Sequence, residues 1–114
     1  MHEASIALSV LDTVTEECRK HGYAAVESVR LRIGKASGIL PEALTFAFDI
    51  AKAETIAREA RLVIDLVPVG GQCPDCRTNF EVEERFLLEC PGCHGTAFTV
   101  TQGYELDIVD MEVN

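Results

Sequence analysis

The order of apolar and polar residues predicts two amphipathic helices in the first half of the chain. Apolar side chains recur three and four positions apart over residues 4–21, and Lys20 and His21 precede Gly22 as a helix ending does. A second helix is expected over residues 41–53, because Pro41 suits a first helical turn. Its apolar face is expected to comprise Leu44, Ala47, Phe48 and Ala51, widened by Phe46 and Ile50.

Three segments show the pattern of β-strands. In residues 26–34, Val29, Leu31 and Ile33 fall on one face, and Ser28, Arg30 and Arg32 fall on the other. A second strand is expected over residues 60–69, ending near Pro68 and the pair Gly70 and Gly71. A third is expected over residues 104–113, where Leu106 and Ile108 alternate with acidic residues.

Charge and composition narrow the class of protein. The 114 residues are 47% hydrophobic and carry a formal net charge of -9, which supports a globular core and disfavours nucleic acid or an anionic membrane as partner. A cation or a basic protein surface suits this charge better. The sequence shows neither an apolar run long enough to span a membrane nor the pattern of a signal peptide. A cytoplasmic protein with reduced thiols is therefore expected.

Four of the five cysteines form two C-x-x-C pairs, Cys73 with Cys76 and Cys90 with Cys93. Two such turns on successive loops can place four thiolates at the corners of a tetrahedron, which is the geometry that Zn(II) accepts. A structural zinc ribbon is therefore predicted, with the intervening stretch TNFEVEERFLLE forming a hairpin between the two turns.

Other interpretations of these cysteines stay open. Residues 90–94 also match the C-x-x-C-H pattern of covalent haem attachment, although that pattern leaves the first pair unexplained. A thioredoxin-like redox site would need only one pair, at the start of a helix. Iron held by four thiolates cannot be distinguished from zinc by sequence. His94 is interpreted as a surface residue, and Cys18 as a small core residue of the first helix.

Together these elements predict an α+β fold: a three-stranded sheet covered by two helices, with an inserted zinc-ribbon module. The expected domains are residues 1–70 with 102–114, and residues 71–101 for the zinc ribbon. Four cysteines would fill the zinc coordination shell and leave no position for substrate, and no catalytic motif is present. The chain is therefore not expected to be an enzyme.

The first three residues offer a second set of metal donors. The Met1 amine, the deprotonated His2 amide and the His2 imidazole can chelate one metal ion, and Glu3 can add a carboxylate. Nitrogen donors in one plane suit Ni(II) or Cu(II) better than Zn(II). The alternative is that His2 is an ordinary terminal residue without a role.

The initial MHE, the RIG that ends the first strand, the PEAL that opens the second helix, and the two C-x-x-C pairs followed by TQGYEL together resemble the HypA/HybF family of hydrogenase nickel-incorporation proteins. The resemblance spans nearly the whole chain. It implies a nickel metallochaperone that works with a nickel-handling GTPase to load the large subunit of [NiFe] hydrogenase, and some relatives also serve urease.

Residue by residue, the resemblance implies nickel ligation by His2, with Glu3 and Met1 contributing, and zinc ligation by the four paired cysteines. The stretch KASGILPEAL offers Glu42 and no acid before Pro41, so it supplies no evident further nickel ligand. A second copy of the chain is a further candidate partner. Two rival functions stay open: a zinc-ribbon interaction module without nickel chemistry, and an electron-transfer protein with a four-thiolate iron site.

Overall fold

The structure is a computed structural model that describes residues 2–114, with the backbone alone described for His2. It divides into two compact units. The first contains the residues up to Leu31 together with Ile39–Asp65 and Asp107–Asn114, and the second contains Arg32–Gly38 and Leu66–Leu106. The domain limits expected from the sequence stay a prediction.

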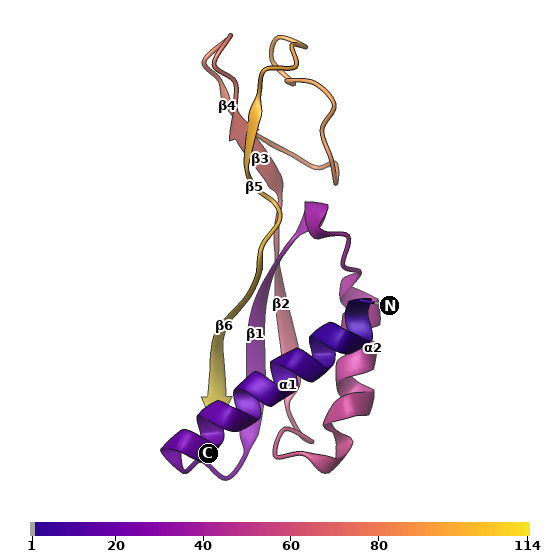
Figure 1. The fold of residues 1–114 in the computed structure, drawn as a ribbon, viewed down its shortest axis with the longest axis vertical. Helices are drawn as coiled ribbons and strands as arrows, with labels where there is room; N and C mark the ends of the chain where they lie inside the picture. Colours follow the sequence, from indigo (N-terminus) through magenta and orange to yellow (C-terminus); the bar gives the residue numbers. More distant parts are fainter. Residues whose placement is uncertain (1) are drawn as a thin grey trace. The chain divides into compact units, whose positions relative to one another are not determined.

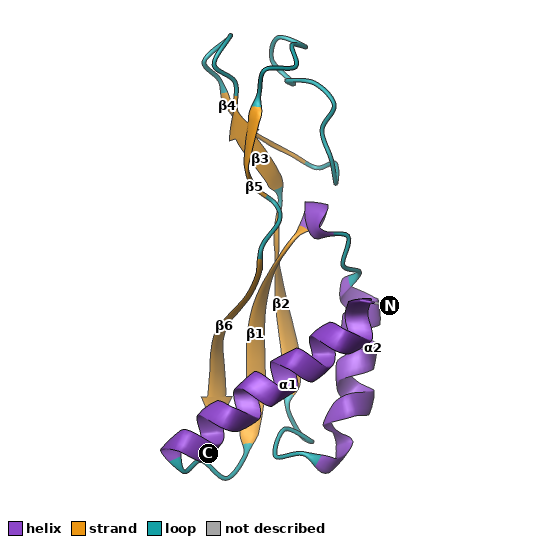
Figure 2. Cartoon of the chain, viewed as in Figure 1, coloured by secondary structure: helices purple, strands orange, loops and turns teal. Residues whose placement is uncertain are grey.

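The described residues form two α-helices, two short 3-10 helices and six strands (Figure 2). The elements in chain order are α1 (His2–His21), β1 (Val26–Gly34), η1 (Lys35–Ser37), α2 (Pro41–Ala51), η2 (Lys52–Glu54), β2 (Arg61–Val67), β3 (Val69–Gln72), β4 (Asn79–Val82), β5 (Thr99–Gln102) and β6 (Leu106–Val113). Both predicted helices and all three predicted strands are present. Neither described helix is long and apolar enough to cross a membrane.

The first unit is built on a three-stranded sheet in the order β2-β1-β6, with α1 and α2 packed against each other (Figure 1). Strand β6 runs antiparallel to β1, because the Asn114 N–H donates to the Ala25 carbonyl at 2.9 Å and the Ala24 N–H donates back to Asn114 at 2.8 Å. The connection from β1 through α2 to β2 returns the chain to the same end of the sheet, so these two strands run parallel. This topology leaves β2 and β6 as edge strands.

The predicted apolar faces form the core of this unit. Among the described side chains, five of α1 are buried, α2 buries Leu44 and Phe48, and β1 contributes Val29 and Leu31. The buried side chains of α1 are Ala7, Val10, Leu11, Val14 and Cys18. The expectation that Phe46 and Ile50 widen the buried face of α2 is wrong, since they are 68% and 62% exposed. Each lies two residues beyond a buried one, about 200° around the helix, and therefore points away from the core.

The other face of the sheet is polar, with one buried position that the pattern does not predict. Ser28 is only 6% exposed, and its hydroxyl donates to Glu112 Oε1 at 2.9 Å. Beside it, Arg30 donates from Nη1 to Asp65 Oδ2 at 3.1 Å, and its Nε lies 3.7 Å from Asp110 Oδ1. These ion pairs stabilise the charged face of the sheet, because they place opposite charges on adjacent strands.

The second unit contains a separate three-stranded sheet in the order β4-β3-β5, both pairs antiparallel. The predicted second strand does end just before Pro68, at Val67. The expectation that Gly70 and Gly71 lie at this strand end is wrong, because both residues lie inside β3. Their glycine character follows from close packing: a Cβ on Gly71 would lie 2.2 Å from the Thr99 carbonyl oxygen. Without side chains, β3 can approach both neighbouring strands.

The hairpin of the zinc module also differs from the prediction. It is formed by β3 and β4, with the register Gln72 to Asn79, so the first C-x-x-C pair sits at its turn. Of the stretch expected to form the hairpin, only Asn79–Val82 is a strand, and residues 83–89 form no regular element. The acidic run in that stretch favours solvent over pairing.

Two phenylalanines of α2 provide a test of the core. Phe48→Ala removes a fully buried ring, so we expect it to lower the free energy of unfolding by about 3 kcal/mol or more. Phe46→Ala removes an exposed ring and should change stability by less than about 1 kcal/mol. Urea unfolding followed by circular dichroism measures both. Equal losses would contradict the placement of the two side chains.

Candidate metal centre

The two C-x-x-C segments fold into turns with the same local geometry. In each turn, the N–H of the first cysteine donates to the carbonyl five residues later: Cys73 to Thr78 at 3.0 Å and Cys90 to Gly95 at 2.8 Å. The residue after the second cysteine has a positive φ in both turns, 58° at Arg77 and 64° at His94. This shared left-handed residue turns the chain back, so that both cysteines of a pair face the same point.

The four sulfur atoms converge on one position. All lie within 4.8 Å of one another, with Cys73 Sγ 3.7 Å from Cys93 Sγ and Cys76 Sγ 3.6 Å from Cys90 Sγ. These distances are far longer than a disulfide bond of about 2.05 Å. A tetrahedral zinc with bonds of about 2.3 Å requires sulfur separations of about 3.8 Å. The four-cysteine cluster therefore fits a structural zinc ion.

Hydrogen bonds from backbone N–H groups and from neighbouring side chains shift the pKa values of two cysteines in the cluster. The Gly92 N–H donates to Cys90 Sγ at 3.3 Å. A hydrogen bond with the Thr78 side chain, helped by the Thr78 backbone, lowers the pKa of Cys76 to about 6. The Gly95 N–H lowers the pKa of Cys93, but hydrogen bonding to Cys73 and desolvation raise it more, to about 12. Without a cation, the cluster therefore holds thiolate and thiol side by side, because four adjacent negative charges repel.

His94 and Cys18 lie where the sequence places them. His94 is exposed, and its Nδ1 lies 3.2 Å from Glu89 Oε1. In the second turn it occupies the left-handed position that Arg77 occupies in the first. The role of His94 in the turn is therefore explained by its backbone conformation. Cys18 is fully buried in α1, and burial raises the pKa of its thiol. It belongs to the core of the first unit.

The N-terminal donor set is only partly described. Met1 lies outside the described residues, and so does the side chain of His2. Glu3 is half-buried in the first turn of α1, and its Oε2 lies 3.5 Å from the Leu40 N–H. That contact supplies a negative charge at the N-terminus of α2, where Leu40 has no side chain able to cap. The contact was not predicted, although an apolar residue at a helix N-cap signals that an acceptor must come from elsewhere.

The comparison with known proteins assigns the family. The sequence model described as "Hydrogenase/urease nickel incorporation, metallochaperone, hypA" matches residues 1–113. The hydrogenase maturation factor HypA of Methylocella silvestris is 42% identical over 113 residues, covering 99% of both chains. That of Chlorobium luteolum is 40% identical over 105 residues, covering 92% of this chain and 89% of the relative.

Solved structures agree with this assignment. The solution structure of the Ni metallochaperone HypA from Helicobacter pylori is 26% identical, with a TM-score of 0.67 over 97% of this chain and 96% of the other. A second solution structure of a HypA protein is 27% identical, with a TM-score of 0.73 over 100% and 97%. Fold and cysteine cluster define a small metal-binding protein with a structural zinc module. The chain belongs to the HypA family of nickel-incorporation metallochaperones.

Replacing a clustered cysteine tests the zinc module. Cys73→Ala should abolish stoichiometric zinc and unfold the second unit, because metal-binding energy there is folding energy. Cys18→Ala, the matched control, should keep its zinc. Metal analysis and amide exchange of residues 69–102 are the measurements. His94→Gly should also keep zinc, since glycine accepts a positive φ; loss of zinc would show that the imidazole is a ligand.

Zinc binding should release protons at pH 7. With a pKa of about 12, Cys93 is protonated at that pH, whereas Cys76, at about 6, is mostly thiolate. Zinc requires all four as thiolates, so affinity should rise with pH as the remaining protons become easier to remove. Calorimetric titration of the zinc-free protein in buffers of different ionisation enthalpy measures the release. Binding heat that is independent of the buffer would contradict it.

Proposed function

We propose that this protein binds Ni(II) at its N-terminus and delivers it to the large subunit of [NiFe] hydrogenase during maturation. The observation that carries the proposal is the family match, whose description is nickel incorporation and whose span includes the first three residues. The proposed ligands are the Met1 amine, the amide and imidazole of His2, and Glu3. The proposed zinc ligands are Cys73, Cys76, Cys90 and Cys93.

The chemistry of the two donor sets supports separate metals. Four thiolates in a closed tetrahedron suit zinc and leave no vacant position. An amine, an amide and an imidazole instead offer planar nitrogen donors that suit Ni(II) and leave a position for a donor from the recipient. Transfer needs such a vacancy, so the nitrogen set is the better candidate for cargo and the sulfur set for structure.

Glu3 has a second role that must be separated from ligation. Its contact with the Leu40 N–H ties the start of α1 to the start of α2. A carboxylate there also offsets the positive ends of two helix dipoles, which would otherwise disfavour a bound cation. Glu3 therefore assists nickel through its charge, whether or not one of its oxygens enters the coordination shell.

Delivery requires partners that accept an acidic protein. The relatives are named hydrogenase maturation factors, and the family description includes urease. We propose that a nickel-handling maturation GTPase and the hydrogenase large subunit are the partners, with a second copy of the chain as a further candidate. The protein itself catalyses no reaction in this proposal.

Nickel titration of untagged protein tests the proposal. Wild type should bind about one Ni(II) per chain with micromolar-range affinity, and His2→Ala should lose that binding while keeping zinc and fold. His21→Ala is the matched control, because His21 is an exposed histidine at the other end of α1. A short N-terminal extension should act like His2→Ala, since it moves the amine away from His2.

Two further variants separate the roles of Glu3. Glu3→Gln keeps an acceptor for the Leu40 N–H and removes the charge, whereas Glu3→Ala removes both. If the charge assists nickel, both variants bind it more weakly than wild type.

Equal nickel binding by wild type and His2→Ala would reject the N-terminal site and favour an interaction module without nickel chemistry.

A further inference from the structure

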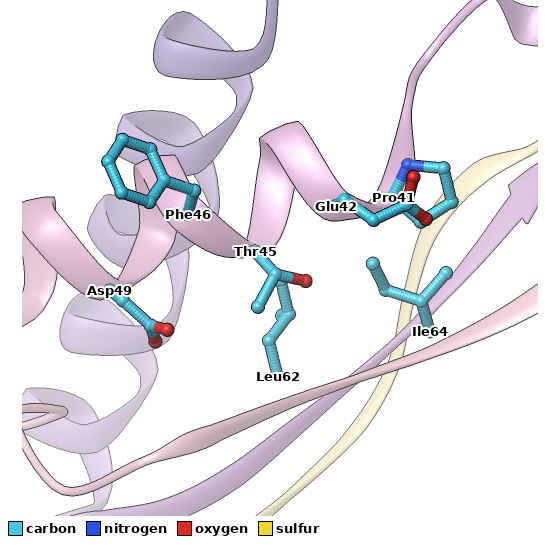
Figure 3. A pocket seen from close by; sticks show the side chains of 7 residues that line it. All are labelled: Pro41, Glu42, Thr45, Phe46, Asp49, Leu62 and Ile64. Atoms are coloured by element: carbon cyan, nitrogen blue, oxygen red, sulfur yellow. The ribbon is translucent and has the colours of Figure 1, made fainter.

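The first unit carries an open groove between α2 and the edge strand β2 (Figure 3). The groove has a volume of about 500 Å³ and lies within one compact unit. Thr45 of α2 points toward Leu62 of β2 in its middle, and Ile64 continues the strand side. Glu42 and Asp49 mark its two ends along the helix. None of these residues belongs to the zinc cluster or to the proposed nickel donors.

The groove exposes apolar surface that the fold does not use. Phe46 lies at its rim and is 68% exposed, whereas Leu62 and Ile64 are half-buried on its strand side. Covering such surface is favourable, because it removes apolar area from water. Figure 3 shows the Phe46 ring directed away from Leu62 and Ile64, so Phe46 borders the groove from the helix side. An exposed aromatic ring at the border of apolar surface is a typical anchor for a protein partner.

The strand side of the groove offers backbone groups as well. Within the described residues, β2 has β1 as its one strand neighbour, so its outer edge carries N–H and C=O groups that face no strand. An extended segment can add to such an edge by main-chain hydrogen bonds, and its alternate side chains then enter the groove. The groove and the edge of β2 can therefore both be occupied by one extended peptide segment.

The acidic ends of the groove define the charge of that ligand. Glu42 and Asp49 are seven residues apart on α2, a rise of about 10 Å. Asp49 Oδ1 lies 2.9 Å from Lys52 Nζ. That lysine side chain is only 17% exposed and also donates to the Ala60 carbonyl. The Asp49 side chain is 53% exposed and therefore stays accessible to a ligand. The chain as a whole carries a net charge of -9. A basic ligand is therefore favoured.

A second copy of this chain fits the groove less well. Pairing of two β2 edges about a two-fold axis would place the two α2 helices antiparallel, with the acid at each end of one helix opposite an acid of the other. Glu42 would then approach Asp49 of the second copy, twice over. Such like-charge contacts oppose association.

We propose that the groove between α2 and β2 docks an extended segment of a partner protein by strand addition. The segment carries an apolar side chain over Leu62 and Ile64, and a Lys or Arg two residues before and two residues after it. Positions i and i+4 of a strand lie about 13 Å apart, and flexible basic side chains can close the difference to the acids at the two ends.

A designed peptide tests the proposal on the full zinc-loaded chain. The probe is acetylated and amidated Gly-Lys-Thr-Ile-Thr-Lys-Gly, added to isotope-labelled protein and followed by amide chemical shifts. We expect saturable shifts confined to β2 and α2. The same peptide with Glu in place of both Lys should bind about fivefold more weakly or worse, because two exposed ion pairs are lost. Added salt should weaken binding of the lysine peptide.

Matched variants complete the test. Glu42→Gln with Asp49→Asn should weaken the lysine peptide about fivefold, whereas Asp12→Asn on the exposed side of α1 should not. Phe46→Ala should weaken it, whereas Ile50→Ala, an equally exposed apolar residue outside the groove, should not. Equal binding of both peptides, shifts outside β2 and α2, or shifts of β2 with protein concentration alone would each overturn the proposal; the last would show that a second copy occupies the groove.

Discussion

Four sulfur atoms within 4.8 Å of one another set the main physical constraint on the second unit. Such a cluster cannot be fully ionised without a cation, and at separations of 3.6 and 3.7 Å its sulfurs are not joined in disulfides. The backbone around it is arranged accordingly, with left-handed residues at Arg77 and His94 and N–H groups directed at the sulfurs. Each left-handed residue costs of order 1 kcal/mol, which zinc binding offsets.

The sequence predicted well where a physical pattern was regular. The helical spacing of α1 and the alternation in β1 led to the correct elements, and paired C-x-x-C turns led to the correct cluster, because local geometry dominates in each case. The two phenylalanines of α2 show the limit. Both are apolar, and only the angle around the helix decides that Phe48 is buried and Phe46 exposed.

Other features depend on contacts between distant residues, and no local pattern contains them. Gly70 and Gly71 resemble a strand end in sequence, yet they form the centre of a sheet because the neighbouring strands approach too closely for side chains. The polar Ser28 is buried because Glu112, 84 positions away, accepts its hydroxyl. The contact of Glu3 with Leu40 likewise joins two helix starts that are far apart in the chain.

Three parts of this small protein have different proposed roles. The sulfur cluster is closed and structural. The proposed nickel donors are mostly nitrogen atoms and leave one coordination position vacant. The groove between α2 and β2 is proposed to dock a basic segment. A partner held at the groove would stay near the chain while cargo is exchanged, which relaxes the demand for tight binding at the nickel donors themselves. The acidic surface serves both tasks, because it favours cations and basic partners alike.

We expect nickel and zinc to occupy different donor sets in this protein. X-ray absorption at the nickel and zinc edges of one doubly loaded, untagged sample distinguishes the two sets. Nickel should show nitrogen and oxygen neighbours, with imidazole scattering and no sulfur, and zinc should show four sulfur neighbours at about 2.3 Å. Sulfur in the nickel shell would contradict it, because nickel would then occupy the four-cysteine cluster.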